Sequence, residues 1–216
     1  MVKIIHNRKN NRLSLKVCGM KHNTLEVAQL EPDYLGFIFF EKSKRNYDKA
    51  AIESLPEGIK KVGVFVDASI EFVLDKIKQF QLDVIQLHGS ETPEYCKSLQ
   101  ARSKVELWKV FSIKDHFDFS VLEAYEAVVD KFLFDTKGKE KGGNGYTFDW
   151  SVLQEYPSQK PFMLSGGIGL GEIPAVNELK KTKLPLFGID VNSKFEDKPG
   201  LKNIDLLKSL VNELNR

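Results

Sequence analysis

Two residues of chemically reactive types stand where short apolar runs end. Cys18 closes the run Leu13–Cys18, and Asp135 follows Phe132-Leu133-Phe134. A thiolate can remove a proton from carbon, and a protonated carboxyl group can donate one to a leaving oxygen. Each residue also has a purely structural interpretation. Cys18 would then be a small buried hydrophobe, and Asp135 a helix cap or an ion-pair partner.

Other polar residues follow other apolar runs. Ser165-Gly166-Gly167 and Asp190-Val191-Asn192-Ser193 end two such runs late in the chain. Turns of this kind can bind a phosphate through backbone N–H groups, because glycine lets the backbone approach it closely. Gly142–Gly145 follows Asp135, and this run is typical of a flexible segment or of a loop that closes over substrate. The histidines lack metal-ligand spacing, so we predict no metal site; they are His6, His22, His88 and His116.

Eight short apolar runs must position these residues. Most are continuous rather than alternating, which is typical of parallel strands that are covered on both faces. We predict strands at Leu13–Cys18, Tyr34–Phe39, Lys61–Val66, Val84–Leu87, Leu107–Phe111, Phe132–Phe134, Phe162–Leu164 and Leu186–Ile189.

The segments between the runs carry helical signals. Apolar residues recur at helical spacing over 70–80 and 204–214, and Thr92-Pro93-Glu94 is typical of a helix start. We interpret Asp67 as the cap of the helix over 70–80, with Ser69 as the alternative cap. Shorter helices are predicted near Asp48–Leu55 and Ile173–Leu179.

Eight such units in 216 residues predict an α/β fold, a (β/α)8 TIM barrel formed as a single domain by residues 13–216. A doubly wound open sheet has the same local pattern, but the number of strands favours the barrel. Residues 1–12 form a basic N-terminal extension that we expect to be flexible. In a barrel, catalytic residues lie at the carboxyl ends of the strands, which is where the polar residues above stand.

Composition excludes several classes of partner. A net charge of +2 without a basic stripe predicts no nucleic-acid partner. No run approaches the roughly 18 apolar residues of a membrane span, so we predict no membrane partner. The two cysteines, Cys18 and Cys96, make no disulfide framework and favour a reducing compartment, so we expect a cytoplasmic protein. Cys96 falls within a predicted helix and is interpreted as structural.

An ordered set of motifs resembles the phosphoribosylanthranilate isomerase family. The resemblance covers about Leu15 to Lys202. Its pieces are Lys16-Val17-Cys18-Gly19-Met20, Phe37–Arg45, Val62-Gly63-Val64-Phe65, Gln86-Leu87-His88-Gly89, Asp135-Thr136, Gly142-Gly143-Asn144-Gly145, Phe148-Asp149-Trp150, Leu164–Ile168, Gly188-Ile189-Asp190-Val191 and Pro199-Gly200-Leu201-Lys202.

The resemblance implies a cofactor-free Amadori rearrangement in tryptophan biosynthesis. N-(5-phosphoribosyl)anthranilate, a small-molecule substrate, would become 1-(2-carboxyphenylamino)-1-deoxyribulose 5-phosphate. Asp135 would be the general acid and Cys18 the general base. These roles need a raised carboxyl pKa and a lowered thiol pKa, so we expect environments that shift the two values in opposite directions.

The resemblance also implies how the substrate is held. Arg45 would pair with the anthranilate carboxylate, Asp190 would lie near the anilino nitrogen, and His88 would line the sugar site. Each of the three has a structural alternative: a surface cation, a structural acid and a structural histidine. The phosphate-binding residues would be Gly143, Gly145, Ser165, Gly166, Gly167, Asn192 and Ser193.

The chain departs from the commonest family pattern at Asn144, where threonine is usual, and at Asn192-Ser193-Lys194, where Ser-Ser-Gly is common.

Two alternative functions stay open. One is another phosphosugar-handling barrel enzyme, such as an indole-glycerol-phosphate synthase or a ribulose-phosphate epimerase. The other is a non-catalytic barrel that binds a phosphate ligand. A monomer and a homodimer are equally compatible with the sequence.

Overall fold

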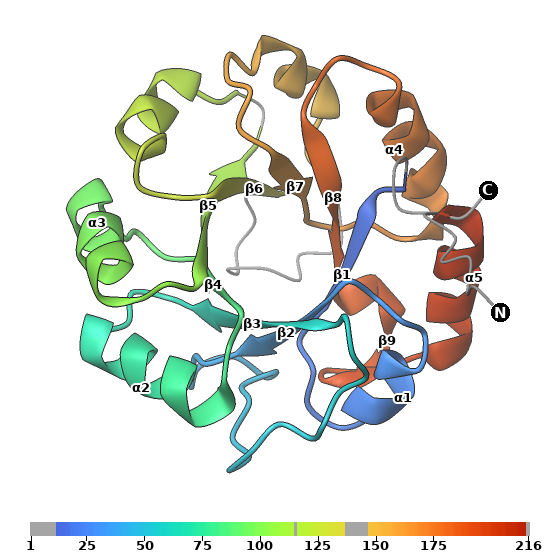
Figure 1. Ribbon diagram of the computed structural model, residues 1–216. Coiled ribbons are helices and arrows are strands. Elements are labelled where there is room, and N and C mark those ends of the chain that lie inside the picture. The colour runs from blue at the N-terminus through green and yellow to red at the C-terminus, as the bar shows by residue number, and fades with distance from the viewer. Residues whose placement is uncertain (1–11, 115, 137–146, 215–216) are drawn as a thin grey trace, which may run out of the picture.

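A closed barrel of eight parallel strands forms the centre of the molecule (Figure 1). The computed structural model describes residues 12–114, 116–136 and 147–214. The strands follow one another in chain order: β1 (Ser14–Cys18), β2 (Tyr34–Ile38), β3 (Lys60–Phe65), β4 (Val84–Leu87), β5 (Glu106–Ile113), β6 (Lys131–Thr136), β7 (Phe162–Leu164) and β8 (Leu186–Val191). Strand β8 pairs in parallel with β1, with Lys16 opposite Asp190. This pairing closes the sheet, so the predicted (β/α)8 barrel is confirmed over the open-sheet alternative.

Helices and short 3-10 segments surround the barrel (Figure 1). The α-helices are α1 (Thr24–Ala28), α2 (Ile70–Phe80), α3 (Pro93–Arg102), α4 (Ile173–Lys180) and α5 (Ile204–Leu214). The 3-10 segments are η1 (Phe119–Tyr125), η2 (Trp150–Glu155), η3 (Leu170–Glu172) and η4 (Ser193–Phe195). After β8, a two-stranded antiparallel hairpin of β9 (Glu196–Lys198) and β10 (Leu201–Lys202) leads into α5.

Two helix starts show how local sequence signals work here. The Thr92 side chain accepts a hydrogen bond from the Tyr95 N–H, with Pro93 in the first turn of α3, as predicted. The assignment of Asp67 as the cap of α2 is wrong, because Ser69 accepts from the Phe72 N–H instead. Asp67 has a positive φ of 50° and accepts from the Ser90 N–H, so it ties the loop after β3 to the loop after β4.

The helix predicted near Asp48–Leu55 is also wrong, since this segment has no helical hydrogen bonding. Side chains donate hydrogen bonds to backbone carbonyl groups that would accept from backbone N–H groups in a helix. The Tyr47 hydroxyl donates to the Ala51 carbonyl (2.8 Å), and Gln79 of α2 donates to the Ala50 carbonyl (3.1 Å). Ile52 and Leu55 still pack against the core. Their apolar pattern therefore reports burial rather than helix.

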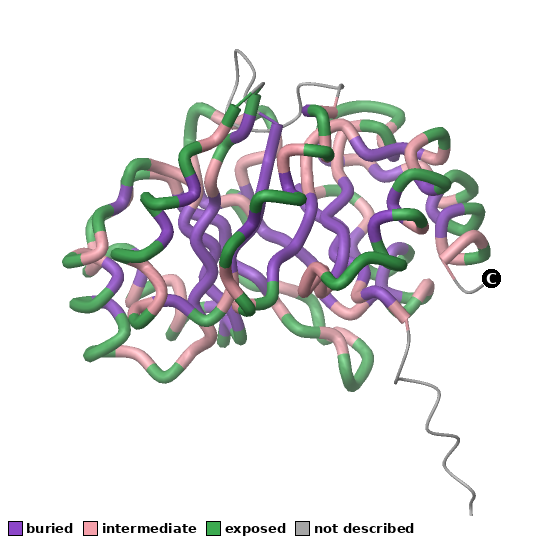
Figure 2. Tube along the Cα trace, turned by 90° about the horizontal axis from the view of Figure 1, so that it is seen from above, coloured by how far each residue is buried: buried purple, intermediate pink, exposed green. Residues whose placement is uncertain are grey.

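The strands are largely buried (Figure 2), and apolar side chains form two clusters around them. The larger cluster fills the space between the barrel and its helices, and the smaller one fills the barrel interior. Tyr34, Trp108 and Phe187 pack edge to face with ring centroids 5.0–6.4 Å apart. These residues belong to the early parts of their strands. They therefore fill the barrel at its amino end, and the site described next lies at the opposite, carboxyl end.

Candidate active site

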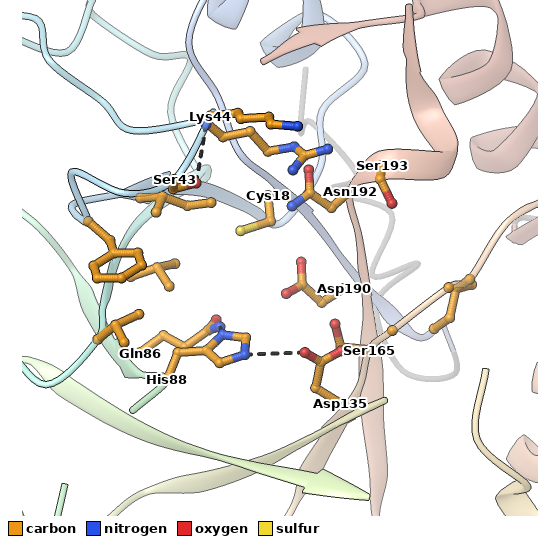
Figure 3. Close-up of a pocket in the computed structure, with 18 of the residues that line it drawn as sticks. Cys18, Ser43, Lys44, Gln86, His88, Asp135, Ser165, Asp190, Asn192 and Ser193 are labelled. Carbon is orange, nitrogen blue, oxygen red and sulfur yellow. Dashed lines mark hydrogen bonds and ion pairs between the residues drawn. The ribbon is translucent and has the colours of Figure 1, made fainter. Parts of the chain in front are cut away.

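A cavity of about 360 Å³ opens at the carboxyl ends of the strands (Figure 3). This is within the size range of small-molecule sites. Its lining includes most of the residues predicted from sequence: Cys18, Arg45, His88, Asp135, Ser165, Gly166, Gly167, Asp190, Asn192 and Ser193. Gly143 and Gly145 lie outside the described residues, as do Asn144 and residues 1–11 of the predicted extension. In Figure 3, Cys18 and Asp135 lie on opposite sides of the open space, and Asp190 lies between them.

Cys18 ends β1 beside a fully buried lysine. Alternation along the strand places Lys16 on the same inner face, and its Nζ lies 2.6 Å from Asp190 Oδ2. Gly36 of β2 leaves room for both side chains. A Cβ there would lie 2.8 Å from Cys18 Sγ and 3.2 Å from Lys16 Cε. The thiol therefore lies next to a buried ion pair.

The charges near Cys18 do not produce the lowered thiol pKa that its proposed role suggested. Burial raises the pKa of Cys18 above its ordinary value, and this outweighs the opposing effect of Lys16. Burial alone would lower the pKa of Lys16, but the Asp190 carboxylate outweighs that and holds the lysine pKa above its ordinary value. Burial therefore favours the neutral thiol form of Cys18 in the free protein, beside a lysine that its contact with Asp190 keeps charged.

The pH dependence of Cys18 alkylation checks this. In a Cys96→Ala background, iodoacetamide modification of Cys18 should rise only above the pH at which free cysteine ionises, about 8.5. The reason is that burial raises the pKa of Cys18. Mass spectrometry of the Cys18 peptide after timed reactions measures the rate. A rate that has already levelled off at neutral pH would contradict the raised pKa.

Asp135, near the end of β6, has a neighbouring group at each of its oxygens. Its Oδ2 lies 3.2 Å from Nε2 of His88, and its Oδ1 accepts a hydrogen bond from the Thr136 N–H (3.0 Å). Gly166, after β7, has φ +88°, and a Cβ there would lie 2.6 Å from Asp135 Oδ1. Glycine at this position therefore lets the β7 loop lie directly against the carboxyl group.

Arg45 reaches the cavity from the loop after β2 and is not the surface cation of the alternative interpretation. Its side chain is 16% exposed, and its guanidinium group binds Glu196 through Nε and Nη2 at 2.7–3.0 Å. Burial alone would raise the pKa of Glu196, but Arg45 and Lys202 outweigh it and lower that pKa. Glu196 is thus a carboxylate at neutral pH, and it lies behind Arg45 as seen from the cavity.

Two loops form the wall where a phosphate was predicted to bind. Ser165, Gly166 and Gly167 follow β7, and both glycines have positive φ, +88° and +71°. Asn192 and Ser193 follow β8 on the same wall. These φ values favour glycine, and both glycines line the cavity.

Sequence reasoning missed the roles of four residues in or behind the site: Lys16, Gln86, Glu196 and Lys202. Gln86 lines the cavity, with its Nε2 3.4 Å from Nδ1 of His88. Lys16 could have been found, because a lysine inside an apolar run shares the inner face with a cysteine two residues later. Glu196 carries no local signal, since its partner Arg45 stands in a distant loop and its partner Lys202 in the next strand of the hairpin.

No group of three or more potential ligands for a metal ion occurs in the described ranges, counting histidine, cysteine, aspartate and glutamate. Within the same residues, no helix is long and apolar enough to cross a membrane.

The fold and the site define a class of protein. The chain is a (β/α)8-barrel enzyme whose mouth brings together a buried thiol, a buried carboxyl group, an arginine and glycine-rich loops. The model of the family "N-(5'phosphoribosyl)anthranilate (PRA) isomerase" matches residues 15–213, and the chain belongs to this family of intramolecular isomerases. The resemblance seen in the motifs is thereby confirmed, and the two alternative functions are set aside.

Curated relatives and solved structures agree. N-(5'-phosphoribosyl)anthranilate isomerase of Parabacteroides distasonis is 44% identical over 207 residues, covering 93% of this chain and 92% of the relative. That of Phocaeicola vulgatus is 42% identical over 204 residues, covering 94% and 98%. The phosphoribosyl anthranilate isomerase structure from Thermotoga maritima has a TM-score of 0.78 at 28% identity, covering 94% of this chain and 98% of its own.

Proposed function

We propose that this chain converts N-(5-phosphoribosyl)anthranilate to 1-(2-carboxyphenylamino)-1-deoxyribulose 5-phosphate by a cofactor-free Amadori rearrangement, with Asp135 as general acid and Cys18 as general base. The single observation that carries the proposal is that both residues face one cavity from opposite sides. A solved member of the family is in complex with reduced 1-(o-carboxyphenylamino)-1-deoxyribulose 5-phosphate, at 26% identity and a TM-score of 0.74.

The first step is acid catalysis. Asp135 donates its proton to the furanose ring oxygen, the bond between this oxygen and C1 breaks, and the anilino nitrogen supplies the electrons that form an iminium at C1. The Thr136 N–H is hydrogen-bonded to one oxygen of Asp135, and His88 Nε2 lies 3.2 Å from the other. The carboxyl group therefore needs no reorientation when the ring oxygen is placed against it.

The second step is base catalysis. The Cys18 thiol gives its proton to solvent, which returns one to the Asp135 carboxylate left by the first step. The resulting thiolate removes the proton from C2, and the electrons of the C2–H bond move into the iminium to give an enolamine. Transfer of the C2 hydroxyl proton to C1 then gives the ketone, so the overall reaction is an isomerisation. Lys16 and the iminium cation both favour the thiolate, and they oppose the burial that raises the pKa of Cys18.

The remaining residues bind the substrate. Arg45 pairs with the anthranilate carboxylate, Asp190 orients the anilino nitrogen, and His88 lines the sugar site. The phosphate is bound by Ser165, Gly166, Gly167, Asn192 and Ser193, together with Gly143 and Gly145. The enzyme acts in the cytoplasm as a monomer or a homodimer; one related isomerase, from Thermotoga maritima, is described as dimeric.

Arg45→Ala should chiefly weaken substrate binding. A charge-assisted hydrogen bond contributes roughly 1.5–3 kcal/mol, which corresponds to about a 10- to 100-fold rise in KM. We expect kcat to change little, because Arg45 is not in the proton-transfer path. Steady-state kinetics with the phosphoribosylanthranilate substrate measure both constants, and Lys49→Ala, an exposed lysine of the same loop that does not line the cavity, is the control. An unchanged KM would refute this role for Arg45.

A further inference from the structure

A buried charge network lies directly behind Arg45. Glu196 accepts hydrogen bonds from Arg45, from Lys202 Nζ (2.8 Å) and from the Gly200 N–H (3.0 Å). Lys202 Nζ also donates to Asn192 Oδ1 (2.7 Å) and to the Asn192 carbonyl (3.4 Å). The side chains of Glu196 and Lys202 are only 3% and 0% exposed, and neither residue lines the cavity. The pair can therefore act on a ligand only through its neighbours.

The guanidinium group of Arg45 has two edges that can each bind a carboxylate. Glu196 occupies the edge formed by Nε and Nη2, at 2.7–3.0 Å. Among the described residues, no acceptor is hydrogen-bonded to Nη1. The edge formed by Nη1 and Nη2 is therefore the one left for a ligand. A planar guanidinium can bind two carboxylates at once in this way.

Packing against the Cys18–Gly19 turn further restricts Arg45. Gly19 has φ +78°, and a Cβ there would lie 2.8 Å from Arg45 Cδ and 2.7 Å from Asn192 Oδ1. The stem of the arginine thus lies against the end of β1, while its head is bound to Glu196. Asn192, on the wall assigned to the phosphate, is fixed by the same Lys202.

We propose that Glu196 is a positioning residue for the substrate's carboxylate: it binds one edge of Arg45, presents the other edge to the cavity, and is itself held by Lys202. This inference rests on the proposed function of the site. Arg45, Lys202 and Glu196 together leave one net positive charge, which the anthranilate carboxylate balances on binding. Lys202 also links this end of the site to the phosphate wall.

A competing interpretation predicts the opposite sign. If Glu196 merely competes with the substrate for Arg45, then removing its charge frees the arginine and KM falls. If Glu196 positions Arg45, the long side chain gains rotational freedom when the carboxylate is lost, and KM rises. We expect the second outcome, because Glu196 binds the Nε–Nη2 edge of Arg45 and so does not block the Nη1–Nη2 edge that is left for the substrate.

The test compares Glu196→Gln and Glu196→Asp with the wild-type chain, using phosphoribosylanthranilate turnover. Glutamine keeps the shape of the Glu196 side chain without its charge. Aspartate keeps the charge, but its side chain is one methylene shorter, so the carboxylate lies farther from Arg45. Glu106→Gln is the matched control. Glu106 is a partly buried glutamate at the start of β5, near the amino end of the barrel, where it pairs with Lys131 and Lys60.

We expect Glu196→Gln to raise KM about 10-fold or more, the effect of one lost charge-assisted contact, and Glu196→Asp to raise it less, each with kcat almost unchanged. Glu106→Gln should leave KM unchanged. In an Arg45→Ala background, Glu196→Gln should change KM no further, because a residue that acts through Arg45 has no effect without it. Circular dichroism verifies that each variant is folded, and Glu196→Asp provides the comparison if Glu196→Gln does not fold.

Three results would overturn the inference: an unchanged KM in both Glu196 variants, a lowered KM, or the same KM rise in the presence and absence of Arg45. The last would mean that Glu196 supports the fold generally. Failure of the proposed function is a different observation, since the wild-type chain itself would then show no turnover.

Discussion

Cys18→Ala should lower kcat by roughly 10²- to 10⁴-fold, the usual contribution of a positioned general base. The substitution removes the sulfur that faces the cavity and leaves the neighbouring Lys16–Asp190 ion pair in place. Substrate binding should change little, because the proposed carboxylate and phosphate contacts come from other loops. Steady-state kinetics with phosphoribosylanthranilate as substrate measure the loss.

Cys96→Ala is the matched control for this prediction. Cys96 is fully buried in α3, outside the residues that line the cavity. Its loss should lower thermal stability slightly and leave kcat unchanged. A Cys18→Ala variant that turns over at nearly the wild-type rate would rule out Cys18 as the base.

Asp135→Asn should lower kcat by a similar factor, about 10²- to 10⁴-fold. Asparagine keeps the shape of the side chain and can still accept the Thr136 N–H hydrogen bond, but it has no acidic proton for the ring oxygen. Ring opening would then depend on water or on a poorly placed group. The same kinetic assay measures the effect, and KM should stay within a few-fold of the wild-type value.

Asp130→Asn tests whether any aspartate near this strand would give the same loss. Asp130 directly precedes β6, so it lies at the opposite end of the strand from Asp135, and its carboxylate accepts from the Leu107 N–H. We expect normal kcat for this variant, with some loss of stability. Equal losses of kcat in Asp130→Asn and Asp135→Asn would point to a folding defect rather than to acid catalysis.

Much of the fold could be predicted from the sequence, because parallel strands covered on both faces are continuous apolar runs. All eight predicted runs overlap the observed strands, and Ile70–Phe80 and Ile204–Leu214 form helices as their spacing indicates. The errors came from local signals with two meanings. In the 48–55 segment, Ile52 and Leu55 are apolar because they pack against the core and not because they lie on a helix. Asp67 resembles a cap but binds the loop after β4.

Part of the candidate site could likewise be predicted from the sequence, and part could not. Cys18, Asp135 and Asp190 could be identified because each stands at or near the end of a strand, where barrel enzymes place their chemistry. The partners of these residues could not be identified, because they come from segments that are far apart in the sequence and meet only in the folded barrel. Lys16 meets Asp190 only because β1 closes the barrel against β8, and Arg45 meets Glu196 only across two separate loops.

The thiol pKa shows why position alone was not sufficient. A nearby lysine suggests a lowered pKa for Cys18, but burial has the larger effect and raises it. Burial therefore favours the thiol in the free enzyme, and in the proposed mechanism the developing iminium of the substrate supplies the additional positive charge that favours the thiolate. The first step of the proposed reaction thus lowers the pKa of the base that the second step needs.

The most direct test of the central claim is turnover of phosphoribosylanthranilate by the purified chain, followed by the fluorescence of its anthranilate group. The substrate is prepared freshly and its spontaneous decay is measured in parallel without protein. We predict fluorescence loss well above this background, reduced toward it in Cys18→Ala and Asp135→Asn. A wild-type rate equal to the background decay would contradict the account.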